Sequence, residues 1–327
     1  MNNSHLAPDA LGPTLCIGEI LVEIVATMPG EGFRNALPLI GPFPSGAPAI
    51  FIDQCGRIGG QAAMIGAVGR DDFGQVNIDR LVRDGVDVSG IAIDPDYPTG
   101  SAFVRYREDG SRDFVFNIER SAAARFGWTP AVAALAARAG HLHVMGSALS
   151  ISGAWEVIRQ VLAQVKARGG TLSLDPNLRK ELTQDVETRE RFLWLVGQAD
   201  LLLPSGEELE DAAGVAGEEA ALAALFARGI KEIVLKRGEA GASCFLSDGR
   251  RIDAPSFVVD AVDPTGAGDC FGGAYLTCRR LGQPVESALD YGCAAGARNA
   301  TLRGPMEGAG TREELDAFIA TTQRRAS

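Results

Sequence analysis

The sequence predicts an α/β protein with a largely parallel central sheet and a small β-sheet appendage, on the strength of three patterns. From residue 130 onward, short apolar strands alternate with helical patterns at the spacing of βαβ units. Two alternating strands within 101–117 flank Asp109-Gly110, which is a strong hairpin signal. The glycine-rich run 266–273 stands between a strand-like segment and a helical pattern, as expected for a loop that opens a helix.

The composition limits the cellular compartment and the classes of binding partner that are expected for this protein. Its 327 residues suit one large domain with a small appendage, and a net charge of −11 disfavours nucleic acid or an anionic membrane as a partner. The N-terminal stretch lacks a secretory signal pattern, and no apolar run reaches the ~18 residues of a membrane span. We therefore expect a soluble cytoplasmic protein. No Cys-x-x-Cys pair occurs, which favours free thiols at Cys16, Cys55, Cys244, Cys270, Cys278 and Cys293.

The first quarter of the chain predicts strands and helices with one irregular interruption. Residues 15–26 read as a single apolar opening strand, in which Glu19 and Glu23 are costly unless they lie at its end or bind a ligand. The Pro- and Gly-rich segment 28–48 is expected to leave the main fold as a loop with short extended pieces. Further elements are then expected: a helix over 47–58, a strand over 62–68 and a helix from Asp71-Asp72 through Arg83.

The region between residues 86 and 122 changes character. Residues 101–107 and 112–117 predict the two strands of a hairpin, with Phe114 and Phe116 on one face and Phe103 beside them. We interpret this hairpin, together with the Pro- and Gly-rich segment, as the small β appendage. An edge hairpin of the main sheet is the alternative.

The remainder of the chain alternates regularly. Such alternation implies parallel strands joined by crossover helices, with ligands bound beyond the carboxyl ends of the strands. Strands are predicted at 141–145, 171–174, 201–203 and 232–235, and helices at 130–139, 154–168, 187–198, 218–228, 268–281, 285–301 and 311–322.

The loop Gly266-Ala267-Gly268 precedes the helix that carries Asp269. Glycines let backbone N–H groups approach a ligand closely, and a helix start adds partial positive charge, so the loop predicts an anion site. A carboxylate in the same turn would repel a phosphate. Its presence indicates that Asp269 meets a hydroxyl group that attacks phosphorus. The loop therefore predicts a phosphotransferase.

Three strand ends carry polar groups that a plain core would not accommodate. Asp175-Pro-Asn177-Leu-Arg179 follows one strand, Ser205-Gly-Glu-Glu208 another and Lys236-Arg-Gly238 a third. Each has an ordinary explanation on its own: a turn, a capping box between Ser205 and Glu208, and a turn between two strands. Together with the glycine loop they converge on one sheet edge, which favours a phosphate and metal site.

Other nucleotide and metal motifs are weak. No Gly-Lys dipeptide occurs, which excludes a P-loop, and Gly266-Ala267-Gly268 lies too far from the first βαβ unit to be a dinucleotide fingerprint. His141 and His143 share one strand face without a third ligand nearby in the sequence. We expect them to be hydrogen-bonded core residues.

With Asp263-Pro-Thr-Gly-Ala-Gly-Asp269 in view, residues 14–320 resemble the ribokinase-like (PfkB) family of sugar kinases, whose C-terminal signature this loop matches. The resemblance implies a three-layer α/β/α fold with a small β-sheet lid, and ATP and Mg²⁺ as cofactors. It places the main domain at 14–26, 45–96 and 120–323, and the lid at 27–44 and 97–119.

The resemblance also assigns roles residue by residue. The Gly266, Ala267 and Gly268 amides would form the anion hole and Asp269 would be the base, with Arg179 offsetting phosphate charge. Glu208 would contact Mg²⁺ through water. Lys236, Gly238, Gly241, Thr265, Gly268 and Cys293 would lie at the nucleotide; Glu23, Gly46, Ile50, Arg105, Arg107 and Asp269 would lie at the sugar.

Several positions depart from the family pattern and bear on the substrate. Ser45-Gly46 replaces a double glycine, Ile50 a sugar-contacting Asn, Glu23 an Asp, and Cys293 an Asn near the adenine. The run 41–51 is most similar to tagatose kinases, so we expect phosphorylation of a ketohexose such as tagatose at O6. Arg105, Arg107 and Asn117 could instead face a carboxylate, which leaves 2-keto-3-deoxygluconate as the alternative.

The charge at the start of the helix is expected to depress the pKa of Asp269 and so make it a modest base. A modest base suits the reaction, because a loose transition state requires little early proton transfer. A catalytically silent sugar- or nucleotide-binding protein is the alternative of another class. The lid is also a candidate surface for a homodimer.

Overall fold

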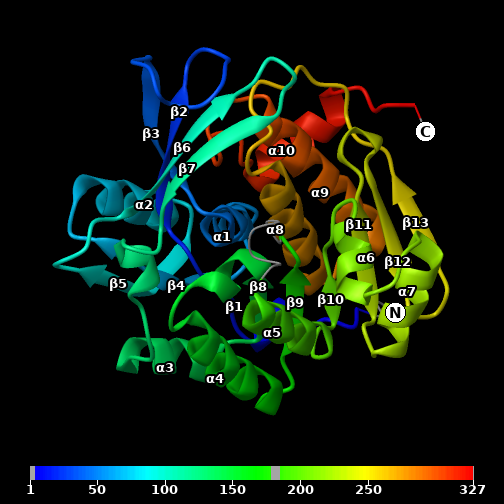
Figure 1. The fold of residues 1–327 in the computed structure, drawn as a ribbon. Coiled ribbons are helices and arrows are strands. Elements are labelled where there is room, and N and C mark those ends of the chain that lie inside the picture. The colour runs from blue at the N-terminus through cyan, green and yellow to red at the C-terminus, as the bar shows by residue number, and fades with distance from the viewer. Residues whose placement is uncertain (1–3, 178–184, 327) are drawn as a thin grey trace.

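A computed structural model describes residues 4–177 and 185–326. Its main body is a nine-stranded sheet in the order β13-β12-β11-β10-β9-β8-β1-β4-β5 (Figure 1). The strands from β11 through β5 run parallel, while β12 and β13 add an antiparallel edge. The strands are β1 (Thr14–Ile17), β4 (Ala62–Gly69), β5 (Val86–Asp94), β8 (His141–Met145), β9 (Thr171–Asp175), β10 (Leu201–Leu202), β11 (Glu232–Lys236), β12 (Ala242–Leu246) and β13 (Arg251–Ala254).

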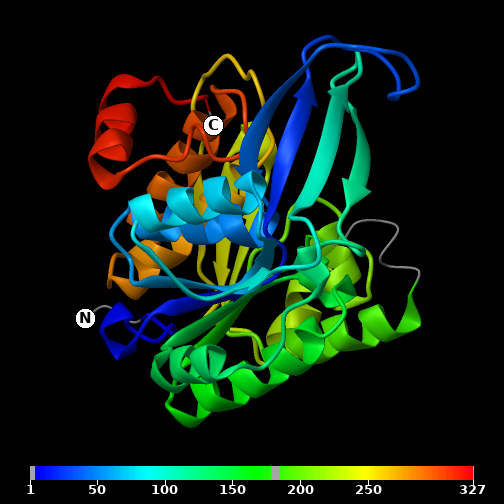
Figure 2. The ribbon, with the colours of Figure 1, turned by 90° about the vertical axis from the view of Figure 1, so that its left-hand side faces the viewer.

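Helices cover both faces of this sheet and bury one hydrophobic cluster on each side, which confirms the three-layer arrangement (Figure 2). One face carries α1 (Ala47–Arg57), α2 (Asp72–Arg83), α8 (Ala267–Arg280), α9 (Val285–Ala300) and α10 (Arg312–Thr321). The other carries α3 (Pro130–Arg138), α4 (Ala154–Ala167), α5 (Val186–Val196), α6 (Glu208–Ala213) and α7 (Glu218–Ala227). Within the described residues, no helix is long and apolar enough to cross a membrane.

A separate four-stranded sheet, in the order β3-β2-β6-β7, rises from one edge of the main body (Figure 2). We call it the lid sheet. It consists of β2 (Leu21–Ala26), β3 (Leu39–Ser45), β6 (Gly100–Tyr106) and β7 (Arg112–Asn117). The predicted hairpin is therefore present as β6 and β7, and the alternative, an edge hairpin of the main sheet, is wrong.

The prediction of one opening strand over 15–26 is wrong. The chain leaves β1 at Gly18, where a Cβ atom would lie 2.5 Å from Pro48 Cγ, and then enters the lid sheet as β2. Residues 21–26, which we placed in the main domain, thus pair with lid strands. Phe103 was also misplaced: it lies opposite Val115, on the other lid face from Phe114 and Phe116, and packs against Phe33.

Other differences concern elements whose pattern is weak. The strand-like run 256–259 forms only an isolated bridge between Phe257 and Arg324. Strands β5, β12 and β13 and the short helix α6 were not placed by the sequence. The two histidines of β8 are buried and hydrogen-bonded as expected: His141 contacts Thr171 Oγ1 at 2.7 Å and His143 contacts Ser173 Oγ at 2.7 Å.

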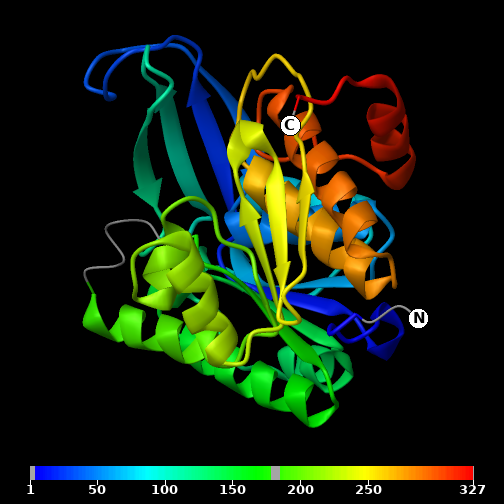
Figure 3. The same cartoon turned by 90° about the vertical axis from the view of Figure 1, so that its right-hand side faces the viewer.

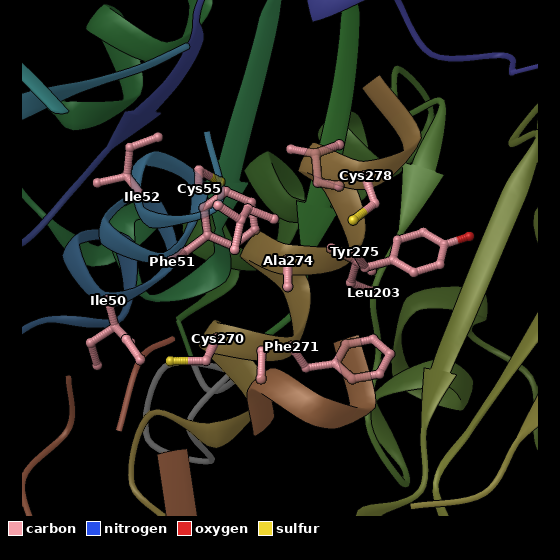
Figure 4. Close-up of a cluster of buried hydrophobic side chains, with 14 of the residues drawn as sticks. Ile50, Phe51, Ile52, Cys55, Leu203, Cys270, Phe271, Ala274, Tyr275 and Cys278 are labelled. Carbon is pink, nitrogen blue, oxygen red and sulfur yellow. The ribbon is translucent and has the colours of Figure 1, made fainter. Parts of the chain in front are cut away.

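Helix α8 is held in the body by close packing and buried ion pairs. A Cβ at Gly273 would lie 2.5 Å from Phe51 O, so the glycines of α8 let it approach α1 closely (Figure 4). On its other side, the Tyr275 hydroxyl donates to Glu232 of β11 at 2.6 Å, and Arg279 pairs with the same carboxylate at 2.9 Å. These contacts join the C-terminal half of α8 to the first residue of β11, and Figure 3 shows the orange helices of this face packed beside the yellow strands.

Candidate active site

The start of α8 has the geometry of an anion site. Gly266 caps the helix at φ 79°, and a Cβ there would lie 2.3 Å from Pro305 O. Only glycine fits both conditions, because other residues adopt this conformation at a cost and have no space for a side chain. The loop is held from the far side by Asn299, whose side-chain amide donates to Thr265 O at 2.9 Å.

The three predicted amides differ in what they bind. The Ala267 N–H donates to Pro264 O at 3.2 Å, whereas the N–H groups of Gly266, Gly268 and Asp269 make no hydrogen bond to any described residue. The first N–H groups of a helix lack intrahelical acceptors and attract an anion. The open amides therefore favour Gly266 and Gly268 over Ala267 as phosphate donors.

Asp269 lies in the first turn of α8, surrounded by other carboxylates. Burial and then the nearby Asp175 carboxylate raise its pKa from its ordinary value to about 7, against the opposing charge of Lys236. Our expectation of a depressed pKa is therefore wrong, because burial and neighbouring charge outweigh the favourable charge at the helix start. A base with a pKa near the working pH suits proton transfer better than the modest base we expected.

Two of the predicted strand exits meet directly beside this loop. Lys236 at the end of β11 donates to Asp175 Oδ2 at the end of β9, at 2.5 Å. Burial lowers the pKa of Lys236, but the Asp175 and Glu208 carboxylates outweigh it and the pKa is raised. A Cβ at Gly268 would lie 3.7 Å from Lys236 Nζ, so the ammonium borders the anion site.

Two carboxylates of this cluster are candidates to contact a magnesium ion, although the described residues contain no group of three or more His, Cys, Asp or Glu side chains that could hold a metal ion. Glu208 Oε2 accepts from both the N–H and the hydroxyl of Ser205 at 2.7 Å, which orients the carboxylate. The capping box considered for these residues is not formed, because α6 begins at Glu208 with Glu207 as its N-cap. Asp175 Oδ1 is buried and makes no hydrogen bond to the described residues. Burial also raises the pKa of Asp175 to about 6, against the opposing charge of Lys236. Carboxylate oxygens are what Mg²⁺ binds in phosphoryl-transfer sites.

Two predicted nucleotide residues meet at the end of β13. A Cβ at Gly241 would lie 2.0 Å from Ala254 O, and the Cys293 thiol lies 3.9 Å from the same oxygen. Burial raises the pKa of Cys293 to about 12, so this position presents a neutral thiol. Gly238 lies in the turn after β11, at φ 55°. Arg179 lies outside the described residues.

The predicted sugar residues Glu23 and Gly46 lie on the side of the site that faces the lid sheet. Glu23 is buried, pairs with Ala102 and so shares a lid face with Tyr106, which reaches the catalytic loop. Gly46 caps α1 at φ 109°, and a Cβ there would lie 2.4 Å from Glu19 O. The Glu19 carboxylate in turn raises the pKa of Asp269.

Ile50 and the two lid arginines do not have the surroundings we expected. Ile50 is buried in the hydrophobic cluster around α1 and α8, so it packs where a polar sugar contact was considered (Figure 4). Arg105 donates to the backbone oxygens of Pro29, Glu31 and Gly32, and Arg107 pairs with Asp113 at 2.6 Å on the exposed surface. Both arginines are engaged within the lid.

Comparison with known proteins agrees with this geometry. The sequence pattern described as "pfkB family carbohydrate kinase" matches residues 15–312. The chain belongs to the pfkB family of carbohydrate kinases. It is 33 % identical to fructokinase-1 of Oryza sativa subsp. japonica over 309 residues, which cover 91 % of this chain and 94 % of that one.

Solved structures of related proteins share the whole fold. A candidate ribokinase II from E. coli superposes with a TM-score of 0.90 at 42 % identity, over 94 % of this chain and 99 % of that one. The same protein has been crystallised in complex with ATP and Mg²⁺ (TM-score 0.89, 41 % identity, 94 % and 99 % covered). Fructokinase from Vibrio cholerae O395, bound to fructose, ADP and calcium, has a TM-score of 0.81 at 27 % identity, over 95 % and 99 %. This pfkB kinase is thus a phosphotransferase with an alcohol acceptor.

Four side chains near Asp269 were given no individual role by the sequence, although the strand exit with Asp175 and the loop that begins at Asp263 were expected at the site. Asp175 and Glu19 act on Asp269, and Tyr106 and Asp263 join the lid to the catalytic loop. A signal existed for the two acids, because a carboxylate at the end of a buried strand is costly without a ligand or partner. Tyr106 gave no such signal, since an alternating hairpin strand accommodates tyrosine without special cause.

Proposed function

We propose that this pfkB kinase transfers the γ-phosphoryl group of ATP to the primary hydroxyl, O6, of a ketohexose. The observation that supports the transfer is the α8 start, where open amides at Gly266 and Gly268 lie in one turn with Asp269, beside Lys236. Phosphoryl transfer has a loose transition state, so positioning and charge stabilisation account for most of the catalysis.

Each group has a defined part in this reaction. The open amides and Lys236 bind the oxygens of the transferring phosphoryl group, and Arg179 is proposed to do the same. Asp269 accepts the proton of the sugar hydroxyl as its oxygen bonds to phosphorus and the bond from phosphorus to the leaving ADP oxygen breaks. Asp175 and Glu208 would hold Mg²⁺, Glu208 through water. The ion neutralises phosphate charge when bound.

The proposed nucleotide side extends from Lys236 to the end of β13. Gly238 and Gly241 let the chain turn closely against the nucleotide, and Cys293 replaces a polar contact near the base with a neutral thiol. We keep Thr265 in the proposal at the edge of the phosphate site, where its hydroxyl already contacts the lid.

A neutral ketohexose is favoured over a keto-deoxy acid. The relatives of the chain include fructokinases, whereas the two arginines considered for a carboxylate are engaged with Asp113 and with backbone oxygens. The carboxylates of Glu19 and Asp269 lie close enough to repel each other, and together they would also repel an acidic substrate. Fructose and tagatose, which differ only in configuration at C4, are the first substrates to compare.

The test is ATP consumption, with Mg²⁺ present, across fructose, tagatose, 2-keto-3-deoxygluconate, ribose and a nucleoside, with the product position read by NMR. The proposal expects the highest kcat/KM for a ketohexose and a 6-phosphate product. Preference for the keto-deoxy acid would overturn the substrate assignment. Thermal stabilisation by sugar and ATP without turnover of any compound would show a binding protein instead.

Compartment and assembly complete the proposal. All six cysteines are buried free thiols, as expected in a reducing compartment, so we place the kinase in the cytoplasm, where ATP is available. The edge strands of the lid sheet expose Leu39, Ile40 and Val115, and such edges pair readily with a second copy. We propose a homodimer through the lid; a monomer in sedimentation equilibrium at micromolar concentration would reject it.

A further inference from the structure

The lid sheet contacts the catalytic loop through two polar side chains at the end of its hairpin. Tyr106 is the last residue of β6, and its hydroxyl donates to Asp263 Oδ1 and lies 3.0 Å from Thr265 Oγ1. Arg112, opposite Tyr106 in the hairpin, donates to the same Thr265 hydroxyl at 2.9 Å. These contacts join residues that are separated by 157 and 153 positions in the sequence.

Asp263 links these lid contacts to the backbone of the catalytic loop. Its side chain is almost fully buried and accepts from the Thr265 N–H through Oδ1 and from the Gly304 N–H through Oδ2, each at 3.0 Å. Gly304 in turn lies against Phe43 of the lid strand β3, where a Cβ would approach the ring to 2.7 Å. The lid residues Tyr106 and Phe43 therefore lie on two sides of the buried Asp263 carboxylate.

The Tyr106 hydroxyl serves as a donor throughout the range of an enzyme assay. Burial raises its pKa well above the ordinary value, and the hydrogen bond to Asp263 raises it further. The Thr265 N–H that Asp263 holds is one residue before Gly266, which caps α8 and offers an open amide. A shift of Asp263 would consequently move the anion site.

We propose that Tyr106 is a positioning residue that fastens the lid to the catalytic loop, so that docking of the lid sets the position of the Gly266 amide. Tyr106 acts through Asp263 and Thr265 and touches no reacting atom. Its effect on turnover rests on the proposed kinase function, whereas its effect on the loop does not, because the contacts join residues of the chain itself.

The first test therefore measures amide hydrogen exchange in the ligand-free protein. Tyr106→Phe removes the hydroxyl and keeps the ring. We expect the hydrogen-bonded amides of Asp263, Thr265, Ala267 and Gly304 to exchange about tenfold faster or more, as expected when a hydrogen bond to a charged group is lost. The matched control is Tyr291→Phe, which removes a tyrosine hydroxyl that donates to Asp316 between α9 and α10. It should leave the loop amides unchanged.

The second test separates positioning from a loss of stability. In Tyr106→Phe, kcat/KM for fructose or tagatose should fall about ten- to a hundredfold while KM for ATP changes less than about threefold. A merely structural residue would lower the melting temperature and the active fraction without changing KM for the sugar.

The outcomes test the positioning role of Tyr106 and the proposed kinase function separately. Unchanged exchange at the amides of Asp263, Thr265, Ala267 and Gly304 in Tyr106→Phe overturns the positioning role, whatever the protein phosphorylates. Faster exchange with an unchanged kcat/KM for the sugar overturns the claim that the lid contact sets the anion site. Faster exchange in a protein that turns over no sugar retains the lid contact and rejects the kinase.

Discussion

Asp269 shows how a residue's surroundings can reverse what its position on a helix implies. The first turn of α8 favours a charged carboxylate, yet burial and then the carboxylates of Asp175, Glu19 and Glu208 act against the charge. Lys236 compensates only in part. The result is a base whose pKa, at about 7, matches the range in which a kinase works.

Replacement of this base tests its role directly. We expect Asp269→Asn to lower kcat by ~10²–10⁴, the usual range for loss of a general base, while ATP binding changes little. Steady-state kinetics and ATP titration calorimetry measure the two quantities. Near-wild-type turnover in the variant would exclude Asp269 as the base.

The raised pKa also predicts the pH dependence of the reaction. Asp269 must be deprotonated to accept the hydroxyl proton, so kcat/KM for the sugar should rise with pH up to about 7 and then level off. At pH 6 we expect about one tenth of the plateau. Profiles between pH 5.5 and 9 measure this, with residual Asp269→Asn activity as the control for ionisation of ATP. An inflection that persists in the variant would belong to another group.

At this scale, the sequence led to Asp269 as the proposed base but did not predict its environment. Gly266, Gly268 and Asp269 are close neighbours in the sequence, so their chemistry can be inferred from the local pattern alone. The Lys236–Asp175 pair joins residues 61 positions apart and the Tyr106–Asp263 contact residues 157 apart. Neither pairing is visible before the chain folds. The same holds for the burial of Asp269 beside Asp175, which reverses the expected direction of its pKa.

Among the elements, the turn into α8 tolerates least change. Gly266→Ala would place a Cβ 2.3 Å from Pro305 O at φ 79°, so we expect a loss of ~1–3 kcal/mol in stability and a fall in kcat of about tenfold or more as the amides move. Gly249→Ala is the control: φ is 89°, but nothing lies within 4 Å of the new Cβ. It should cost ~1 kcal/mol and leave kcat unchanged. Equal kinetic effects in the two variants would contradict this account.

The lid hairpin supplies a second prediction at this scale. Arg107 pairs with Asp113 on the exposed surface, where ion pairs contribute little. Arg107→Ala should therefore change KM for the ketohexose by less than about twofold. Measurement of KM for fructose, tagatose and 2-keto-3-deoxygluconate checks this, and a tenfold loss confined to the acid would restore Arg107 as a carboxylate contact.

Element prediction succeeded where local pattern and tertiary pairing agree. Helices and strands from 130 to 236 follow their periodicity closely, because each βαβ unit buries one face of its helix on neighbouring strands. The run 15–26 is uniformly apolar, yet it serves two sheets, and only pairing with β4 and β8 or with β3 and β6 reveals the break. Strand β5 contains Gly90, which weakens its alternation.

The whole molecule combines a packed α/β body with a site in which several carboxylates lie close together. Lys236 is the one cation that acts on both Asp175 and Asp269 in the described cluster, against the added charge of Glu208. Such crowding of like charges costs stability and is typical of functional sites. Stability and activity should therefore oppose each other at Asp269.

This opposition has a defined pH dependence. The folded-state pKa of Asp269, about 7, exceeds its ordinary value of 3.8, so the folded protein binds this proton more tightly than the unfolded chain does. The resulting stabilisation is fully present below about pH 4. It is lost as the pH rises through 7.

The inactive variant should consequently be the more stable protein at alkaline pH. Asn cannot ionise, so Asp269→Asn should exceed the wild type by ~1–3 kcal/mol, or about 2–6 °C in Tm, at pH 8. The difference should shrink steadily toward pH 4, where the wild-type carboxyl is protonated. Thermal unfolding of both proteins across this range measures it. A gap that is constant with pH would mean that Asp269 does not titrate near 7, and the activity profile would then need another base.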